Sequence, residues 1–170
     1  MAIYYHLSTS GEDTNLQLYS YREAKRGWDS LYREYEKYGD EADDLKERCV
    51  FVLATLGLSI SQLLGQNNPD VGERVPYPRN IFFNLVDTHQ LDPRLKEKYN
   101  RFNYFYNGCR HFGVTLNDSA HNKIDELTFK VASECFEFGL EIWRIVINIY
   151  AADPENDLSE LFTFDTLSDY

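Results

Sequence analysis

The sequence predicts an all-α fold, a bundle of four to five helices with a long insert between the second and the third. Three observations carry this prediction. Apolar side chains recur at steps of three and four residues over most of the chain. Only 9 glycines and 5 prolines occur in 170 residues, too few for a β protein with many turns. Aromatic residues make up 15% of the chain, which indicates a packed core.

The first two helices follow from apolar spacing and capping residues. The first is expected over residues 18–38, where aromatic and aliphatic side chains share one face, and Gly39 should end it. Asp40 is expected to cap the second, which is apolar nearly all round between residues 49 and 58 and should close at Gly65. Such a helix belongs at the centre of a bundle. Residues 65–92 hold three of the five prolines and should form the insert, with a helical turn or two near 81–86.

The third helix should start at Asp92-Pro93 and stop at Gly113, because an acceptor followed by proline is a helix-start signal. Its core face is predicted to hold Leu95, Tyr99, Phe102, Tyr106 and Cys109. At about 100° per residue, a separate polar stripe forms. That stripe holds Asn100, Tyr104, Asn107 and His111.

The fourth helix is expected to run unbroken from Asp118 or Ser119 to about Ala152, with two apolar stripes. One stripe can face the bundle, so the other needs a second surface. The economical prediction is a homodimer through this helix; the alternative is that the N-terminal segment or the C-terminal tail covers it. The side chains predicted for the dimer interface are Phe129, Phe136, Leu140, Trp143 and Ile147. One helical domain, residues 1–152, and a tail, residues 153–170, complete this organisation.

Charge is distributed unevenly along the chain. The net charge is −11, which counts against a broad polyanion-binding surface. The basic segment, residues 94–111, nevertheless carries five bases and one acid, whereas the tail carries six acids and no base. Apolar residues alternate with those acids, so we expect the tail either to bind a protein partner or to fold back on the basic segment.

The remaining features exclude several classes of protein. Cys49, Cys109 and Cys135 are odd in number and lie in apolar surroundings, which predicts buried, reduced thiols in a cytoplasmic protein. The apolar run 49–64 contains polar residues and is short for a membrane span, and no secretory signal is recognisable, so a soluble protein is expected. The sequence contains no Cys-X-X-Cys pair and no glycine-rich phosphate loop, and its four histidines lack ligand spacing, so we expect neither a metal nor a cofactor.

A small helical domain with a polar motif ending in His at the third helix, and a long apolar helix behind it, resembles the HEPN (higher eukaryote and prokaryote nucleotide-binding) superfamily. The resemblance covers roughly residues 18–152. Many members of that superfamily are metal-independent ribonucleases with an Arg, four to six intervening residues and a His, and two copies meet to form one site. Asn107 and His111 match the polar residue and the His of this motif, but Tyr106 occupies the position of the Arg, and Arg110 lies beside His111 instead.

The resemblance implies a microbial toxin–antitoxin or phage-defence protein that binds RNA or a nucleotide, and possible metal-independent endoribonuclease activity. Cleavage without a metal requires groups that take and give protons and a cation for the phosphate charge. In this hypothesis His111 transfers the proton and Arg110 supplies the cation. Tyr104 adds a hydroxyl and Asn107 positions the phosphate or the His. The substrate-binding residues would be Asn100, Arg101 and Lys98.

Two alternatives stay open. Asn and His near a helix end also bond its last carbonyl groups, so the same residues can be purely structural. The chain can also be a catalytically inactive module, or an acidic interaction protein that inhibits a nucleic-acid-binding partner, which the net charge permits.

Overall fold

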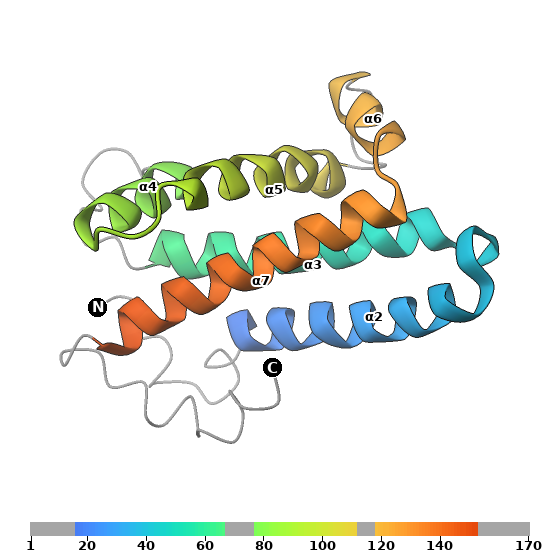
Figure 1. Ribbon diagram of the computed structural model, residues 1–170, viewed down its shortest axis with the longest axis horizontal. Helices are drawn as coiled ribbons and strands as arrows, with labels where there is room; N and C mark the ends of the chain where they lie inside the picture. Colours follow the sequence, from blue (N-terminus) through green and yellow to red (C-terminus); the bar gives the residue numbers. More distant parts are fainter. Residues whose placement is uncertain (1–15, 67–76, 112–117, 153–170) are drawn as a thin grey trace.

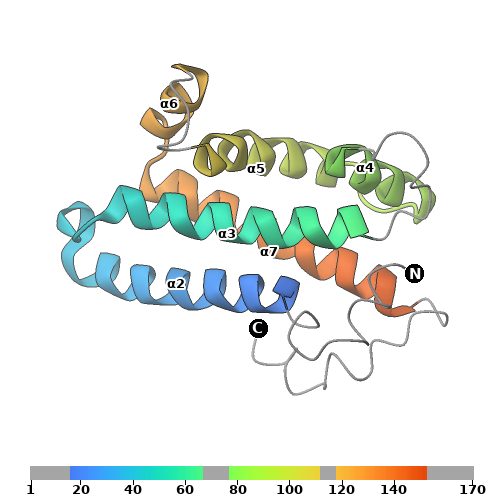
Figure 2. The same ribbon diagram turned by 180° about the vertical axis from the view of Figure 1, so that it is seen from behind.

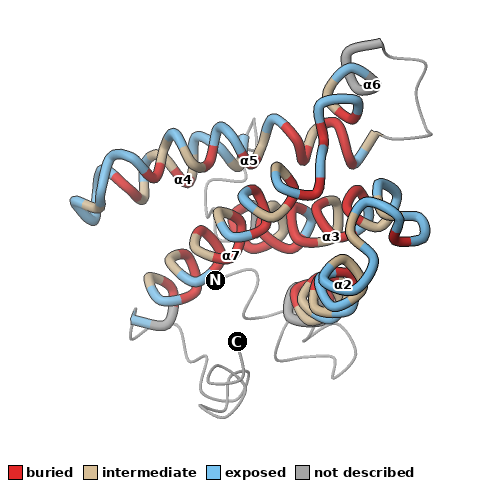
Figure 3. The backbone as a smooth tube through the Cα atoms, turned by 45° about the vertical axis from the view of Figure 1, so that its right-hand side comes forward, coloured by how far each residue is buried: buried red, intermediate tan, exposed pale blue. Residues whose placement is uncertain are grey.

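The computed structural model describes residues 16–66, 77–111 and 118–152, and all regular structure in these ranges is helical, as the sequence predicted. Helix α2 (Leu16–Tyr38) lies antiparallel to α3 (Leu45–Gln66), and α7 (Phe129–Ala152) crosses α3. Helices α4 (Pro78–Thr88) and α5 (Arg94–Arg110) lie on the other side of α3 from α2 (Figure 1). A short helix, α6 (Asp118–Asp125), stands near the C-terminal end of α5. In Figure 3 the buried residues gather where these helices face one another.

Helix α3 forms the centre of the bundle, as its apolar sequence predicted. It contacts α2, α4, α5 and α7. Over Leu45–Leu64 its mean hydropathy is 1.4, so by length and composition it could cross a membrane, but 56% of that stretch is buried against the other helices. We therefore assign it as the core helix of the bundle.

The turn between α2 and α3 differs from the prediction in one respect. Gly39 ends α2 as expected, with a φ of +60° that favours glycine. Asp40, however, does not cap α3. It lies in a 3-10 turn, η2 (Gly39–Glu41), and α3 begins only at Leu45, after Asp44 with a φ of 50°. The chain reverses direction here through two residues in the left-handed conformation, Gly39 and Asp44, so the turn is longer than the predicted single capping residue.

The insert holds more helix than expected. Helix α4 has 11 residues, whereas the sequence predicted one or two turns. Pro78 occupies the start of this helix, where a backbone N–H has no partner within the helix, so the missing N–H of proline costs no hydrogen bond. Pro78 was interpreted as a sign of a loop, but it marks the start of a helix. Phe82 and Val86, four residues apart, are buried, and the Phe82 ring stacks on Tyr99 of α5 at 5.0 Å.

Helix α5 begins as predicted. The Asp92 side chain accepts a hydrogen bond from the backbone N–H of Arg94 at 3.0 Å. The helix ends at Arg110, and His111 follows as its C-terminal capping residue. The predicted stop, Gly113, lies outside the described residues.

The prediction of one unbroken fourth helix is wrong. The chain forms α6, turns at residues 126–128 and then forms α7. Thr128 begins α7, because its hydroxyl accepts a hydrogen bond from the N–H of Val131 at 3.2 Å and its carbonyl accepts one from Ala132 at 2.8 Å. Leu127, in the turn, is buried.

The second apolar stripe of α7 faces α2 within the same chain, which corrects the predicted dimer surface. Trp28 of α2 stacks on Phe129 at 5.3 Å and on Phe136 at 4.8 Å. Tyr21 stacks on Trp143 at 3.9 Å. All five side chains predicted for the interface are at most 9% exposed, so they do not form a surface for a partner. The sequence interpretation failed because it assigned the covering surface to a second subunit rather than to the first helix.

Candidate functional site

The polar stripe of α5 exists, and it ends beside α6. Asn100 and Tyr104 are exposed, whereas Asn107 and His111 are half-buried. His111 has left the helix, and its backbone N–H bonds the carbonyl of Cys109. The backbone of His111 thus completes the C-terminal end of α5, and the roles predicted for the His111 side chain stay predictions.

Tyr104 is held by the short segment that follows α5. Its hydroxyl donates a hydrogen bond to Glu126 Oε1 at 3.2 Å, and Lys123 Nζ lies 4.7 Å from the centre of its ring. Partial burial, followed by the hydrogen bond and the charge of Glu126, raises the pKa of Tyr104. The phenol of Tyr104 therefore keeps its proton and donates it in a hydrogen bond to a carboxylate.

Arg110 is exposed and lies along its own helix. Its guanidinium carbon is 5.6 Å from the centre of the Tyr106 ring, four residues earlier on the same side of α5. His111 follows about 100° further round. The guanidinium therefore lies on the Tyr106 side of α5.

Tyr106, which holds the position of the motif arginine, belongs to the core. It is 6% exposed and stacks on Phe102 at 6.1 Å. Its ring also lies against Gly57 of α3, so closely that a Cβ at position 57 would overlap it. A charged side chain at position 106 would be buried between α3 and α5.

The other predicted substrate-binding cations join α5 to α7. Lys98 Nζ is 2.5 Å from Glu141 Oε2, and Arg101 Nη2 is 3.7 Å from Glu134 Oε2. The remaining cations of the basic segment before Arg110 are also paired, Lys96 with Asp87 at 2.6 Å and Arg94 with Asp92 at 2.7 Å. In the ranges that the structure describes, no carboxylate pairs with Arg110. The basic segment is thus largely neutralised.

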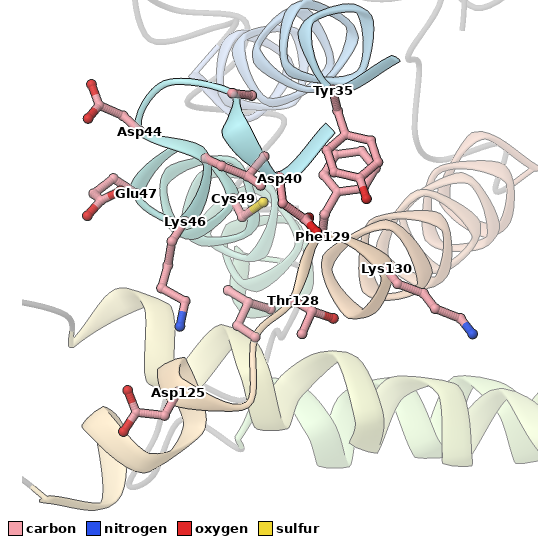
Figure 4. A pocket seen from close by; sticks show the side chains of 13 residues that line it. Tyr35, Asp40, Asp44, Lys46, Glu47, Cys49, Asp125, Thr128, Phe129 and Lys130 are labelled. Carbon is pink, nitrogen blue, oxygen red and sulfur yellow. The ribbon is translucent and has the colours of Figure 1, made fainter. Parts of the chain in front are cut away.

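The structure also contains a pocket that the sequence interpretation did not find. It has a volume of about 700 Å³ and lies between the α2–α3 turn and the α6–α7 turn (Figure 4). That size is within the range of small-molecule sites. Four carboxylates and two lysines line it: Asp40, Asp44, Glu47, Asp125, Lys46 and Lys130. The pocket forms where the chain turns between α6 and α7, and the sequence analysis predicted an unbroken helix there.

One wall of this pocket is aromatic. Tyr35 stacks on Phe129 with ring centres 3.6 Å apart. Burial, followed by the charge of Asp40 and a hydrogen bond to it, raises the pKa of Tyr35. In the described part of the chain, no group of three or more His, Cys, Asp or Glu side chains is arranged to hold a metal ion. The pocket therefore presents negative charge and the face of an aromatic ring.

The three cysteines are free and buried, as predicted, and they belong to three different helices. Burial raises the pKa of each thiol to about 12, and the charge of Cys135 and then of Cys49 contributes to the shift at Cys109. Thiols in this state are protonated and poor nucleophiles. Each was placed correctly on a core stripe, but their proximity across α3, α5 and α7 is a tertiary feature.

We compared the chain with models of protein families, with curated proteins and with solved structures, and found no significant match.

Proposed function

We propose that this chain is a non-enzymatic, HEPN-like interaction protein that presents carboxylates to a basic protein partner. The observation that carries the proposal is the separation of charge. The cations of α5 before Arg110 are paired with acids, whereas the α2–α3 turn and the first turn of α3 expose five carboxylates within eight residues: Asp40, Glu41, Asp43, Asp44 and Glu47. We call this group the acidic turn.

The acidic turn is well placed for such a role. It lies at one end of the bundle, at the tip of two long helices (Figure 2). Among the described residues none of its five carboxylates forms an ion pair, and its one lysine, Lys46, leaves a local charge of −4. A cluster of this kind raises the rate at which a basic surface is encountered. Nucleic-acid-binding proteins carry such basic surfaces.

Binding to a lysine- and arginine-rich peptide tests this proposal. We expect the full chain to bind the peptide with an affinity that falls as salt rises, and to leave single-stranded RNA unbound at physiological salt. The variant Asp43→Asn/Asp44→Asn should weaken peptide binding several-fold, because it removes two charges from the acidic turn. Asn tolerates the left-handed backbone at position 44, so the turn should keep its shape.

A matched control separates local from total charge. Glu97→Gln/Glu137→Gln removes the same charge from exposed positions on α5 and α7 and should leave peptide affinity almost unchanged. Equal weakening by both variants would attribute binding to net charge alone, and tighter binding of RNA than of the peptide would contradict the proposal.

RNA cleavage is a second candidate, which the exposure of Arg110 favours. Its guanidinium has no described carboxylate partner and lies one residue from His111, and a second copy or a local change in the helix end could bring the two groups to one phosphate. Incubation of the chain with structured RNA in EDTA tests it against His111→Ala and Arg110→Ala. Under the primary proposal the RNA stays intact in all three reactions. Cleavage by the wild type that both variants abolish would establish the ribonuclease instead.

A further inference from the structure

Helix α3 is central to the bundle, yet one side of it is uncovered by any described helix. Phe51 is 61% exposed and Leu58 is 45% exposed, two turns apart on the same side. Small or uncharged residues that are half-buried lie around them. We call this side the α3 face, and it consists of Phe51, Ala54, Thr55, Leu58, Ser61 and Gln62.

The α3 face lies between α2 and α5, and α7 packs on the opposite side of α3 (Figure 2). No charged residue occurs in the sequence from Cys49 to Leu64, a length of about 24 Å of helix. In a chain with a net charge of −11, such an uncharged and partly apolar strip is an unusual surface. An exposed Phe and Leu on one helix side are typical of a contact surface rather than of a solvated one.

We propose that the α3 face binds a second copy of this chain. Two copies with this net charge repel one another over most of their surfaces, and the approach costs least where charge is absent. A two-fold axis between Ala54 and Thr55 sets Phe51 against Leu58 of the partner subunit, so that the two exposed apolar side chains cover each other.

Charge determines how the two helices are oriented. The N-terminal end of α3 carries Asp43, Asp44 and Glu47, all exposed. A parallel arrangement would bring the two sets of carboxylates together, whereas an antiparallel one separates them by about 22 Å or more along the helix axis. Antiparallel helix dipoles also attract one another. The α3 helices of the dimer are therefore antiparallel.

This interface differs from the predicted one on the fourth helix, and it does not depend on the proposed function. Sedimentation equilibrium of the full chain, in reducing buffer, tests it directly. We expect concentration-dependent formation of a species of twice the chain mass of 20.0 kDa, at concentrations of tens of micromolar. Phe51→Asp and Leu58→Asp should each raise the dissociation constant at least tenfold, since they bury a charge in the contact.

Thermal unfolding and a matched control distinguish a loss of dimerisation from a folding defect in the variants. Phe51 and Leu58 are exposed, so both variants should unfold cooperatively with a helical circular dichroism spectrum like that of the wild type. Tyr77, at the start of α4, is 77% exposed and lies outside the α3 face, so Tyr77→Asp should dimerise normally. A wild type that is monomeric at about 100 μM would overturn the proposal and favour cover of the face by residues 153–170. Dimers that persist in both α3 variants would overturn it too.

Cross-linking tests the orientation. Phe51→Cys and Leu58→Cys are prepared separately, mixed and oxidised; the native cysteines are buried and should not react. An antiparallel dimer gives mainly disulfides between the two different variants. Disulfides formed mainly within each variant would mean parallel helices and would overturn the proposed arrangement.

Discussion

The ring of Tyr106 lies flat against the backbone of α3 at Gly57, with no room for a Cβ between them. We therefore expect Gly57→Ala to destabilise the protein by about 1–3 kcal/mol, the usual cost of overpacking a core. Urea unfolding followed by circular dichroism measures this change. The expected sign opposes intrinsic helix propensity, by which alanine in a helix is about 1 kcal/mol better than glycine.

The Tyr106→Ala background provides the control for this contact. With the ring removed, the same Gly57→Ala change should become neutral or stabilising, because only the higher helix propensity of alanine then affects stability. If Gly57→Ala stabilised the wild type as much as it stabilises Tyr106→Ala, the close approach of α5 to α3 would be wrong.

Periodicity predicted which side of α5 is buried, and it did so because that property is local. Tyr106 and Cys109 fall on the stripe that the sequence assigned to the core, and both are buried. The ion pairs of the cations on α5, by contrast, depend on residues that are distant in the sequence. Lys98 pairs with Glu141, 43 residues away in sequence, so its charge is neutralised by a helix whose position no spacing rule gives. The basic segment thus resembled a binding surface in the sequence but forms a contact between α5 and α7.

Releasing these cations should create the nucleic-acid affinity that the wild type is expected to lack. In Glu134→Gln/Glu141→Gln the partners of Arg101 and Lys98 lose their charge. We expect tighter binding of single-stranded RNA, with a salt dependence of log K against log salt steeper by about 1.4, the value for two added phosphate contacts. Fluorescence anisotropy over a salt series measures it.

The variant Glu97→Gln/Glu137→Gln removes the same charge but leaves both of these ion pairs intact. It should therefore bind RNA no more steeply than the wild type. A similar rise in both variants would mean that total charge, rather than the release of Lys98 and Arg101, controls binding.

The buried thiols predict a loss of stability at alkaline pH. Their pKa is raised from 9.0 to about 12 in the folded chain, so between these values the unfolded chain loses thiol protons that the folded chain keeps. Unfolding then becomes more favourable as pH rises, by roughly 1 kcal/mol per thiol per pH unit. Urea midpoints at pH 8 and pH 10, with a reducing agent present, should show this decrease. Cys109→Ala should reduce it by about one third, and an unchanged slope would contradict burial of that thiol.

Other errors of the sequence interpretation have a common physical cause. The aromatic stripe of α7 was correctly recognised as needing a cover, but the periodicity of one helix does not name the helix that covers it. Trp28 and Tyr21 of α2 do so. Likewise Pro78 starts a helix in a segment whose prolines suggested a loop. Thr128 starts a helix in a segment whose apolar spacing suggested one continuous helix. Among the site residues, His111 was correctly placed at the end of its helix, and its proposed chemistry stays a prediction.

The start of α7 offers a test of the corrected helix boundary. Thr128 accepts the hydrogen bond of the Val131 N–H through its hydroxyl, and its side chain is exposed. Thr128→Ala should cost about 1 kcal/mol in the free energy of unfolding, whereas Thr128→Ser keeps the acceptor and should change stability little. In an unbroken helix the order would reverse, because alanine is the best helix former and serine a weaker one. Urea unfolding of the two variants therefore distinguishes a helix that starts at Thr128 from one that runs through it.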